Sequence, residues 1–589
     1  MDPNYRPRQR RATSVDGLSS RRISKPNITK IPVRITDTPI SKIATSGSLL
    51  NTTIPGRSYP ASQSILNKNT IHSPKKKHSK KKIIGLSFLA FVILIIGFIG
   101  WDGWQLYHKL HKLTVGNLTS SVDGTENILV AGSTNRCNLS VQNYQWGFCS
   151  DGVTGVNSDI IFIVHLNPAT HSVSLLSIPR DTFIPDARSG NEAFKIDAAL
   201  YEGPTQLVAA VVQDFGIPIQ HYVEVGFDGF VNIVNAIGGI KMDFPMPVYD
   251  SESYLNVQEP GCHLLNGVEA LQVVRARHLQ YKPASVTTNY TYYWPQEAES
   301  DIARIARTHE FLRVLASSVI AKGVSNPFTD QKLIDAIAPQ VQVDSGFSTS
   351  TMLELLEDFR SVSINNVPQY TLPIVTPSFG SYTYGGEDMG DVVFPVEQAD
   401  QQIIDKFLGE SSNTNTMTGQ LLPASQSVAV NVINGSDTPN QATTISDGLN
   451  QLGFNIASQP TNGTPVSDQA QETLVYYASS ATVGDALAVA SHLTGYVVIS
   501  ENSSQVSSGS EVTVSTGTGA TVIGQSSGNG SSSGSSTGSS TNSQTSSASS
   551  SSSSSSPLGS ISPANESLAA WDPRACSVNQ NVIPNNANL

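Results

Sequence analysis

The sequence predicts an α/β protein with one membrane span and two folded units. Three observations support this prediction. Strand and helix patterns alternate from about 125 to 410, a shorter alternation of the same kind runs from 425 to 516, and residues 83–101 form an apolar stretch without a charge. The predicted order is therefore an N-terminal tail, a membrane anchor and two α/β units.

The charge of the chain changes sign at the apolar stretch. Residues 1–82 contain 18 lysines and arginines against 3 acidic residues, whereas the remainder contains 18 against 44. The stretch Ile83–Trp101 comprises 19 residues, and a helix of this length spans roughly 28 Å, close to the ~30 Å hydrocarbon core of a bilayer. The basic flank predicts a cytoplasmic N-terminus and an extracytoplasmic remainder, with 102–124 as a neck.

The basic tail 1–82 is rich in Ser and Pro and lacks apolar periodicity, so we expect it to be disordered. Its lysines beside the apolar stretch are typical of residues that lie against an anionic membrane surface. We therefore expect the membrane as a partner and no nucleic acid.

The first unit, 125–410, begins with the apolar strand "ENILVAGS". The segment "DIIFIVHLNPATHSVSLLSIPRD" then reads as two strands joined by an Asn-Pro turn, with Arg180 and Asp181 at its end. Expected helices are Gly203–Gly216, a segment within His221–Phe244, the first part of Leu265–His278, and Glu299–Gly323. Arg275 and Arg277 are placed on a strand that follows the third of these helices.

The second unit, 425–516, reads as a strand, a helix stopped by Gly453, and another strand. Residues 517–562 are predicted to be a linker, because Gly524–Ser556 is almost entirely Ser, Gly, Thr, Asn, Gln and Ala and cannot bury enough apolar area to fold. The sequence assigns no role to the last segment, 563–589.

All four cysteines lie in the part predicted to be extracytoplasmic, where disulfides persist. Four cysteines allow three pairings. We favour Cys137–Cys149, because these two residues flank one short polar loop.

Cations gather in the first unit, although that part of the chain is poor in them. Arg275 and Arg277 would share one face of a strand, and Arg304 and Arg307 one face of a helix, with Asp301 one turn earlier. The full set is Arg136, Arg180, Lys195, Arg275, Arg277, Arg304 and Arg307. Each could simply pair with a nearby carboxylate, but the set as a whole favours a polyanion site, because forked guanidinium groups match phosphate oxygens.

Five motifs in chain order now carry a family resemblance: "SIPRDTFIP", "KIDAAL", "GFDGFVNIVNAIGGI", "LLNGVEALQVVRARH" and "DIARIAR". Across Glu126–Leu408 the chain resembles the LytR–CpsA–Psr family of cell-envelope glycopolymer transferases. The second unit, with "VAVNVINGS" near its start, resembles the LytR C-terminal domain.

The resemblance implies a central mixed sheet between helices and an apolar groove for a polyprenyl chain. It also implies a phosphotransferase that moves a glycopolymer from polyprenyl pyrophosphate to a peptidoglycan sugar hydroxyl and leaves a phosphodiester. Catalytic or pyrophosphate-binding roles are implied for Arg136, Arg180, Lys195, Arg275, Arg277, Arg304 and Arg307. Asp159 matches an Asp that binds Mg²⁺ and is also the nearest candidate base, while Asp181 is expected to orient a neighbouring Arg.

Three positions depart from the family pattern. Thr134 stands where a metal-binding Asp is expected, Asn157 replaces an Arg, and Thr308 replaces a Gln. Because Mg²⁺ commonly uses one or two carboxylates together with substrate phosphates and water, Asp159 alone or with Asp151 could supply the protein ligands.

Two other functions fit the same sequence. The first is a hydrolase that cleaves polyprenyl pyrophosphate with water as the acceptor. The second is a non-catalytic envelope scaffold that binds the lipid-linked polymer, which the three departures keep open.

Overall fold

A computed structural model describes residues 110–137, 139, 144–152, 154–298, 300–323, 335, 337–359, 361–377, 380–436, 438–462, 472–523, 555–556, 559–562 and 567–583. Among these residues no helix is both long and apolar enough to cross a bilayer. The predicted tail 1–82 and the predicted span Ile83–Trp101 lie outside the described residues.

The first unit is built on a seven-stranded mixed sheet in the order β1-β13-β7-β2-β3-β4-β14. Its central strands β2 and β3 pair antiparallel, and β7 lies parallel to β2. The predicted mixed sheet is thus confirmed. Its strands are β1 His111–Leu113, β2 Glu126–Ser133, β3 Ser158–Asn167, β4 Ser172–Ser177, β7 His221–Val225, β13 Gln342–Asp344 and β14 Gln369–Thr371.

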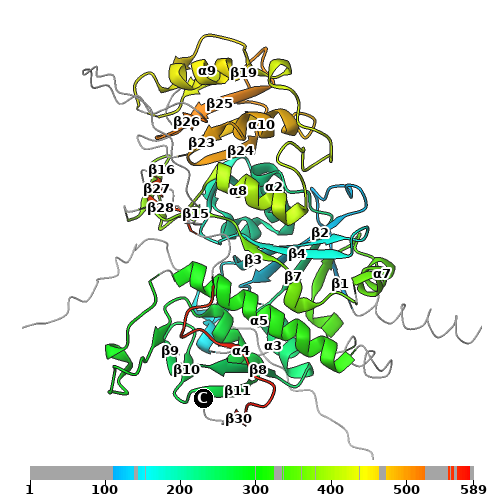
Figure 1. The fold of residues 1–589 in the computed structure, drawn as a ribbon, viewed down its shortest axis with the longest axis vertical. Helices are drawn as coiled ribbons and strands as arrows, with labels where there is room; N and C mark the ends of the chain where they lie inside the picture. The colour runs from blue at the N-terminus through cyan, green and yellow to red at the C-terminus, as the bar shows by residue number, and fades with distance from the viewer. Residues whose placement is uncertain are drawn as a thin grey trace, which may run out of the picture. The chain divides into compact units, whose positions relative to one another are not determined.

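Helices cover both faces of this sheet, with α2 and α8 on one side and α3, α4 and α5 on the other (Figure 1). The period-two alternation of β2 and β3 explains why both faces are apolar. Leu129 and Ile163 are fully buried under α2 and α8, whereas Val130 and Phe162 face the opposite side. The helices are α2 Pro204–Phe215, α3 Phe227–Ala236, α4 Gly267–Arg275, α5 Ser300–Gly323, α7 Thr349–Phe359 and α8 Glu397–Leu408.

Local signals in the sequence account for the ends of these helices. Pro204 occupies the first turn of α2, and Gly216 ends it in the left-handed conformation. Asn266 and Glu269 form a reciprocal capping box at the start of α4. A Cβ at Gly267 would lie 2.2 Å from the Val231 carbonyl oxygen, so α4 can approach α3 this closely only with glycine there.

The first unit also contains smaller ladders and short helical turns. A four-stranded sheet has the order β29-β8-β11-β30, and its outer strands come from the last segment of the chain. These smaller elements are β5 Phe183–Arg188, β6 Glu192–Lys195, β8 Ile240–Phe244, β9 Val248–Asp250, β10 Leu255–Val257, β11 Gly261–Leu265, β12 Gln280–Tyr281, β29 Arg574–Ala575, β30 Val582–Ile583, η1 Tyr144–Trp146, η2 Cys149–Asp151 and η3 Ile196–Glu202.

The second unit is a six-stranded sheet with two helices. It has a core of its own, which contains Val430, Ile445 and Val514 among others. Its elements are β19 Ala429–Asn434, α9 Gln441–Gln451, β20 Asn455–Ile456, β21 Thr461–Asn462, β22 Thr473–Tyr477, α10 Val483–Ala490, β23 Leu493–Thr494, β24 Val497–Glu501, β25 Val512–Thr516 and β26 Thr521–Val522.

Several predicted boundaries differ from the structure. The segment predicted to be a neck, 102–124, contributes β1 to the main sheet, where β1 pairs with β13. Leu110, just before β1, packs in an apolar cluster with Val343 of β13. The predicted linker 517–562 starts too early, since Val522 is buried in the core of the second unit. The sequence predicts no role for the last segment, 563–589, yet this segment supplies two strands to the first unit.

Candidate pyrophosphate and lipid site

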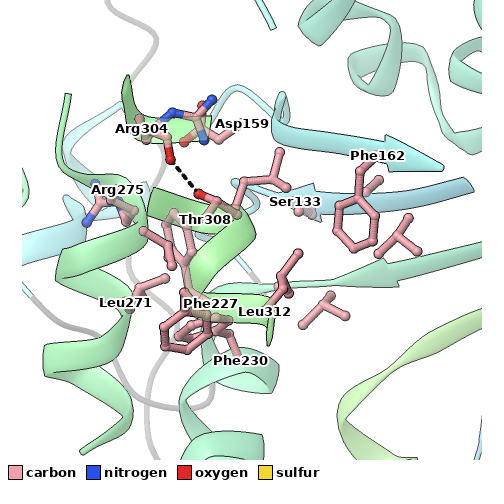
Figure 2. Close-up of a pocket in the computed structure, with 18 of the residues that line it drawn as sticks. Ser133, Asp159, Phe162, Phe227, Phe230, Leu271, Arg275, Arg304, Thr308 and Leu312 are labelled. Atoms are coloured by element: carbon pink, nitrogen blue, oxygen red, sulfur yellow. Dashed lines mark hydrogen bonds between the residues drawn. The ribbon is translucent and has the colours of Figure 1, made fainter. Parts of the chain in front are cut away.

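An elongated cavity of about 300 Å³ lies between the sheet and helices α3, α4 and α5. Figure 2 shows Arg275, Arg304 and Asp159 toward one end of it, and Phe230, Leu271 and Leu312 farther along. Its apolar lining comes from Val130, Ala131, Ile160, Phe162, Val225, Phe227, Phe230, Ile233, Val234, Leu271, Val274, Phe311, Leu312 and Leu315. The cavity thus combines an apolar part with a part lined by charged side chains.

Arg180 is the most heavily paired cation of the site. It follows the end of β4 and donates to the carboxylate of Asp159. Its Nη2 also lies 3.1 Å from Oδ2 of Asp197. Burial lowers the pKa of Arg180, but Asp159, Asp197 and Asp181 outweigh this effect and raise it above the ordinary value, so Arg180 is a permanent cation.

Two further aspartates pair with Lys195, Arg277 and Arg304. Asp181 accepts from Lys195 at 3.2 Å and from Arg277 at 2.9 Å. Asp301 lies 3.2 Å from Nε of Arg277 and 3.0 Å from Nε of Arg304. Burial opposes ionisation of Asp301, but Arg304 and Arg277 outweigh it and hold the pKa of Asp301 below its ordinary value.

Arg136 and Arg275 lie over an aromatic ring. Their guanidinium carbons are 5.5 and 5.0 Å from the centroid of Phe227. Arg136 donates to the carbonyl of Trp146, and Arg275 to the carbonyl of Gln145 at 3.4 Å. Burial lowers the pKa of both arginines, and Asp159 opposes that effect.

The turn that presents Gln145 and Trp146 is closed by a disulfide. Cys137 and Cys149 are bonded, with their Cα atoms 5.0 Å apart, which confirms the predicted pair. The second disulfide, Cys262–Cys576, joins residues that are 314 positions apart.

The site brings together six of the seven predicted cations. Arg180, Arg275, Arg277 and Arg304 line the cavity, while Lys195 and Arg136 connect to it through Asp181 and Phe227. Four aspartates form ion pairs with Arg180, Lys195, Arg277 and Arg304, and Glu252 also lines the cavity. The Nε atoms of Arg180 and Arg277 make no hydrogen bond within the described part of the chain.

Two predicted placements need correction. Arg275 is the last residue of α4 rather than part of a strand, and Arg277 lies in a bend between α4 and β12; both still line the cavity. Arg307 does not join the site, because its fully buried guanidinium points to Glu297 and Asp572.

The three departures from the family pattern have structural partners. The hydroxyl of Thr134 accepts from the amide of Asn157 at 2.9 Å, and the side-chain amide of Asn157 donates to Asp197 at 3.3 Å. Thr308 lines the cavity, and its hydroxyl donates to the carbonyl of Arg304 at 2.9 Å (Figure 2).

Asp197 is a site residue that the sequence reasoning missed. It is buried between Arg180 and Asn157, and burial raises its pKa to about 7. The only sequence signal was its place in "KIDAAL", two residues after Lys195. Phe227 was missed as well, because a ring under two arginines cannot be distinguished in sequence from an ordinary core residue.

The described residues do not form a metal site from side chains alone. Among them no group of three or more His, Cys, Asp or Glu side chains could hold a metal ion. Asp159 lines the cavity, whereas Asp151 is exposed in η2 and lies outside its lining. Of the two predicted metal ligands, only Asp159 faces the space where a pyrophosphate would lie.

The fold and this cavity define an α/β protein with a mixed sheet and an apolar cavity that is also lined by arginines. The LytR_cpsA_psr family model matches residues 105–393, and a second model, described as LytR cell envelope-related transcriptional attenuator, matches 427–519. The first unit therefore belongs to the LytR–CpsA–Psr family, and the second is a LytR C-terminal domain.

Relatives with names share these parts. The probable cell wall biosynthesis protein LcpB of Corynebacterium glutamicum is 30% identical over 268 residues, which is 45% of this chain and 58% of LcpB. LcpA of the same organism is 26% identical over 65% of this chain and 75% of its own. Bacillus subtilis TagV, named a polyisoprenyl-teichoic acid–peptidoglycan teichoic acid transferase, is 31% identical over 33% of this chain and 49% of its own.

A solved LytR-Csp2A-Psr enzyme from Actinomyces oris covers 51% of this chain and 96% of its own, at 23% identity and a TM-score of 0.39. The matched part of this chain thus spans between about half and three quarters of the three named relatives.

Proposed function

We propose that this protein transfers a glycopolymer from a polyprenyl pyrophosphate carrier to a sugar hydroxyl of peptidoglycan. One observation carries the proposal: an apolar cavity is lined at one end by Arg180, Arg275, Arg277 and Arg304. A polyprenyl chain fits the apolar part, and guanidinium groups bind pyrophosphate oxygens in pairs. The name of TagV supports the same reaction class, and the name of LcpB supports a role in cell wall biosynthesis.

The reaction balances without an added oxidant or reductant. The acceptor hydroxyl attacks the phosphorus that carries the glycan, the bridging P–O bond of the pyrophosphate breaks, and polyprenyl phosphate leaves. Asp159, which lines the cavity, is the proposed acceptor of the hydroxyl proton. The arginines stabilise charge on the phosphoryl oxygens in the transition state, which is the main task of the protein in phosphoryl transfer.

We propose Mg²⁺ as the cofactor, held by Asp159 together with oxygens of the pyrophosphate. This donor set fits the preference of Mg²⁺ for one or two carboxylates plus phosphate and water. When bound, the ion would neutralise negative charge on the pyrophosphate.

The proposed location follows from the charge pattern of the chain. We propose that residues 83–101 form a single-pass anchor with a cytoplasmic N-terminus. The reason is that 18 basic residues lie before it, in residues 1–82, and the acidic remainder of the chain follows it. The cavity would then lie outside the cell, where the lipid carrier and peptidoglycan meet.

Product analysis tests this function. Full-length protein in vesicles would be given a polyprenyl-pyrophosphate-linked oligosaccharide, peptidoglycan fragments and Mg²⁺, with products read by mass spectrometry. We expect a phosphodiester-linked sugar on the fragment, absent from an Arg275→Ala/Arg277→Ala variant and retained by the control Arg188→Ala, whose guanidinium lies over Phe194 instead.

Two outcomes would replace the proposal. Release of a sugar phosphate without transfer would make the protein a hydrolase of polyprenyl pyrophosphate. Binding of the lipid without any turnover would make it a scaffold for the lipid-linked polymer.

A further inference from the structure

The last described segment of the chain, residues 567–583, is here named the C-terminal strap. Its residues Arg574–Ala575 pair with β8, and its residues Val582–Ile583 pair with β11. The disulfide Cys262–Cys576 attaches the strap covalently to β11. Figure 1 shows the strap in red beside these strands and α5. The strap is therefore an integral part of the first unit, even though the second unit intervenes in the sequence.

The strap reaches a buried arginine that borders the site. Oδ1 of Asp572 accepts from Nη1 of Arg307 at 2.9 Å, and both side chains are almost completely buried, with 2% and 0% of their surface exposed. Glu297 accepts from the same guanidinium at 2.6 and 2.8 Å. Because an unpaired buried charge is strongly destabilising, the two carboxylates hold Arg307 in one orientation.

In that orientation Arg307 holds the segment between the two site arginines. Its Nη2 donates to the carbonyl of Ala276 at 2.7 Å, and Ala276 is the residue between Arg275 and Arg277. Glu297 accepts from the amide of Leu279 at 3.4 Å and donates its own amide to the Leu279 carbonyl at 3.0 Å. The backbone that presents the arginine pair is thus fixed at both ends by one buried charge cluster.

A second contact of the strap bears on the same segment. The ring of Trp571 stacks on Tyr281 in β12, with centroids 3.8 Å apart and planes 5° apart. Tyr281 lies only four residues after Arg277. Adjacent residues of the strap, Trp571 and Asp572, therefore contact β12, which follows the two arginines in the chain, and Arg307, which holds the Ala276 carbonyl between them.

We propose that Asp572 is a positioning residue for Arg275 and Arg277, and that it acts from the strap through Arg307 and the Ala276 carbonyl. Asp572 is not among the residues that line the cavity; it sets the geometry of the two cations that would hold the pyrophosphate. The inference rests on the proposed function, because it assigns the strap to the anion end of that site.

The test compares full-length wild type with Asp572→Asn, which keeps the size of the side chain and removes its charge. The probes are geranylgeranyl pyrophosphate and geranylgeraniol, which share an apolar chain and differ in the pyrophosphate. We expect Asp572→Asn to weaken binding of the pyrophosphate roughly tenfold and to leave binding of the alcohol unchanged. Asp572→Glu should recover part of the affinity, because it restores the charge.

Hydrogen exchange supplies a readout that needs no ligand. Amides of residues 276–279 should exchange faster in Asp572→Asn than in wild type, because the Arg307 contact to Ala276 loosens. The control Gln580→Ala removes a different contact of the strap, the hydrogen bond from Gln580 to Asp243. It should change neither the exchange at 276–279 nor the affinity for the pyrophosphate.

The outcomes separate this inference from the proposed function. If wild type binds no geranylgeranyl pyrophosphate, the proposed function fails, and unchanged exchange at 276–279 would overturn the strap's role as well. If wild type binds geranylgeranyl pyrophosphate and Asp572→Asn binds it equally well, only the positioning role of Asp572 fails. The same holds if Asp572→Asn loses affinity for geranylgeranyl pyrophosphate and geranylgeraniol to the same extent. Should Asp572→Asn not fold, Asp572→Glu decides. A partial loss confined to the pyrophosphate, together with faster exchange at 276–279, supports the role, and an equal loss of both probes rejects it.

Discussion

Arg277 donates a hydrogen bond of 2.9 Å to Asp181, although 96 residues separate them in the chain. Asp181 also accepts from Lys195 at 3.2 Å and lies 3.5 Å from Nε of Arg180. One carboxylate therefore holds three cations that come from three different motifs. This arrangement agrees with the orienting role expected for Asp181, and it explains how like charges remain close together before an anion binds.

Replacing Asp181 should disturb the arginines more than the fold. In Asp181→Asn the bonds to Lys195 and Arg277 lose their charge, and hydrogen bonds to charged groups contribute about 1.5–3 kcal/mol. We expect kcat/KM for transfer to fall about 10- to 100-fold, with a small change in melting temperature. Steady-state kinetics on Glu192→Gln, which removes the exposed partner of Arg188, should match wild type. A kcat/KM of Asp181→Asn equal to that of wild type would contradict the prediction.

Asp197 should make the stability of the first unit depend on pH. Burial raises its pKa from 3.8 to about 7, so between these values the folded chain keeps a proton that the unfolded chain releases. Stability from this group is therefore complete below about pH 4 and is lost as pH rises to about 7, by up to about 1.4 kcal/mol per pH unit.

Denaturant unfolding at a series of pH values measures this effect. Asp197→Asn cannot release a proton, so its stability should decline less between pH 4 and 7 than that of wild type. Identical pH profiles for the two proteins would show that Asp197 titrates in the folded state as it does in the unfolded chain.

Sequence patterns predicted the central strands and most helices of the first unit because each pattern was local. Alternation in "ENILVAGS" and the Pro204 and Gly216 signals needed no tertiary information. The pattern misplaced Arg275, because a helix that ends in an extended segment reads like a helix running into a strand. Both arginines nevertheless line the cavity.

Non-local partners explain what the sequence could not predict. Arg307 lies three residues after Arg304 on α5, as expected for a second site arginine. Its partners Glu297, Asp572 and the Ala276 carbonyl nevertheless hold its guanidinium outside the cavity lining. The Cys262–Cys576 pair closes 314 residues, a separation for which no local pattern exists. The role of the strap could not be predicted for the same reason, because Asp572 of the strap pairs with Arg307, which lies 265 residues earlier in the chain.

Opening the Cys137–Cys149 disulfide should loosen the arginine end of the site. The loop that it closes carries the Gln145 carbonyl that accepts from Arg275 and the Trp146 carbonyl that accepts from Arg136. A Cys137→Ser/Cys149→Ser variant should lose about 2–3 kcal/mol of unfolding free energy. It should also bind geranylgeranyl pyrophosphate several-fold more weakly, as measured by calorimetry; unchanged affinity would show that the loop does not hold these arginines.

Filling the apolar part of the cavity should separate lipid recognition from anion recognition. Leu312 on α5 lines the cavity away from the arginine cluster (Figure 2). Leu312→Trp adds volume where a polyprenyl chain would lie, and overpacking of this kind costs about 1–3 kcal/mol. We expect affinity for geranylgeranyl pyrophosphate to fall at least tenfold while affinity for inorganic pyrophosphate stays within twofold of wild type. Arg304→Ala provides the converse control, with both affinities reduced. Equal losses of both ligands in Leu312→Trp would show that the substitution distorts the arginine end, whereas undiminished binding of the long-chain ligand would mean that the lipid lies elsewhere.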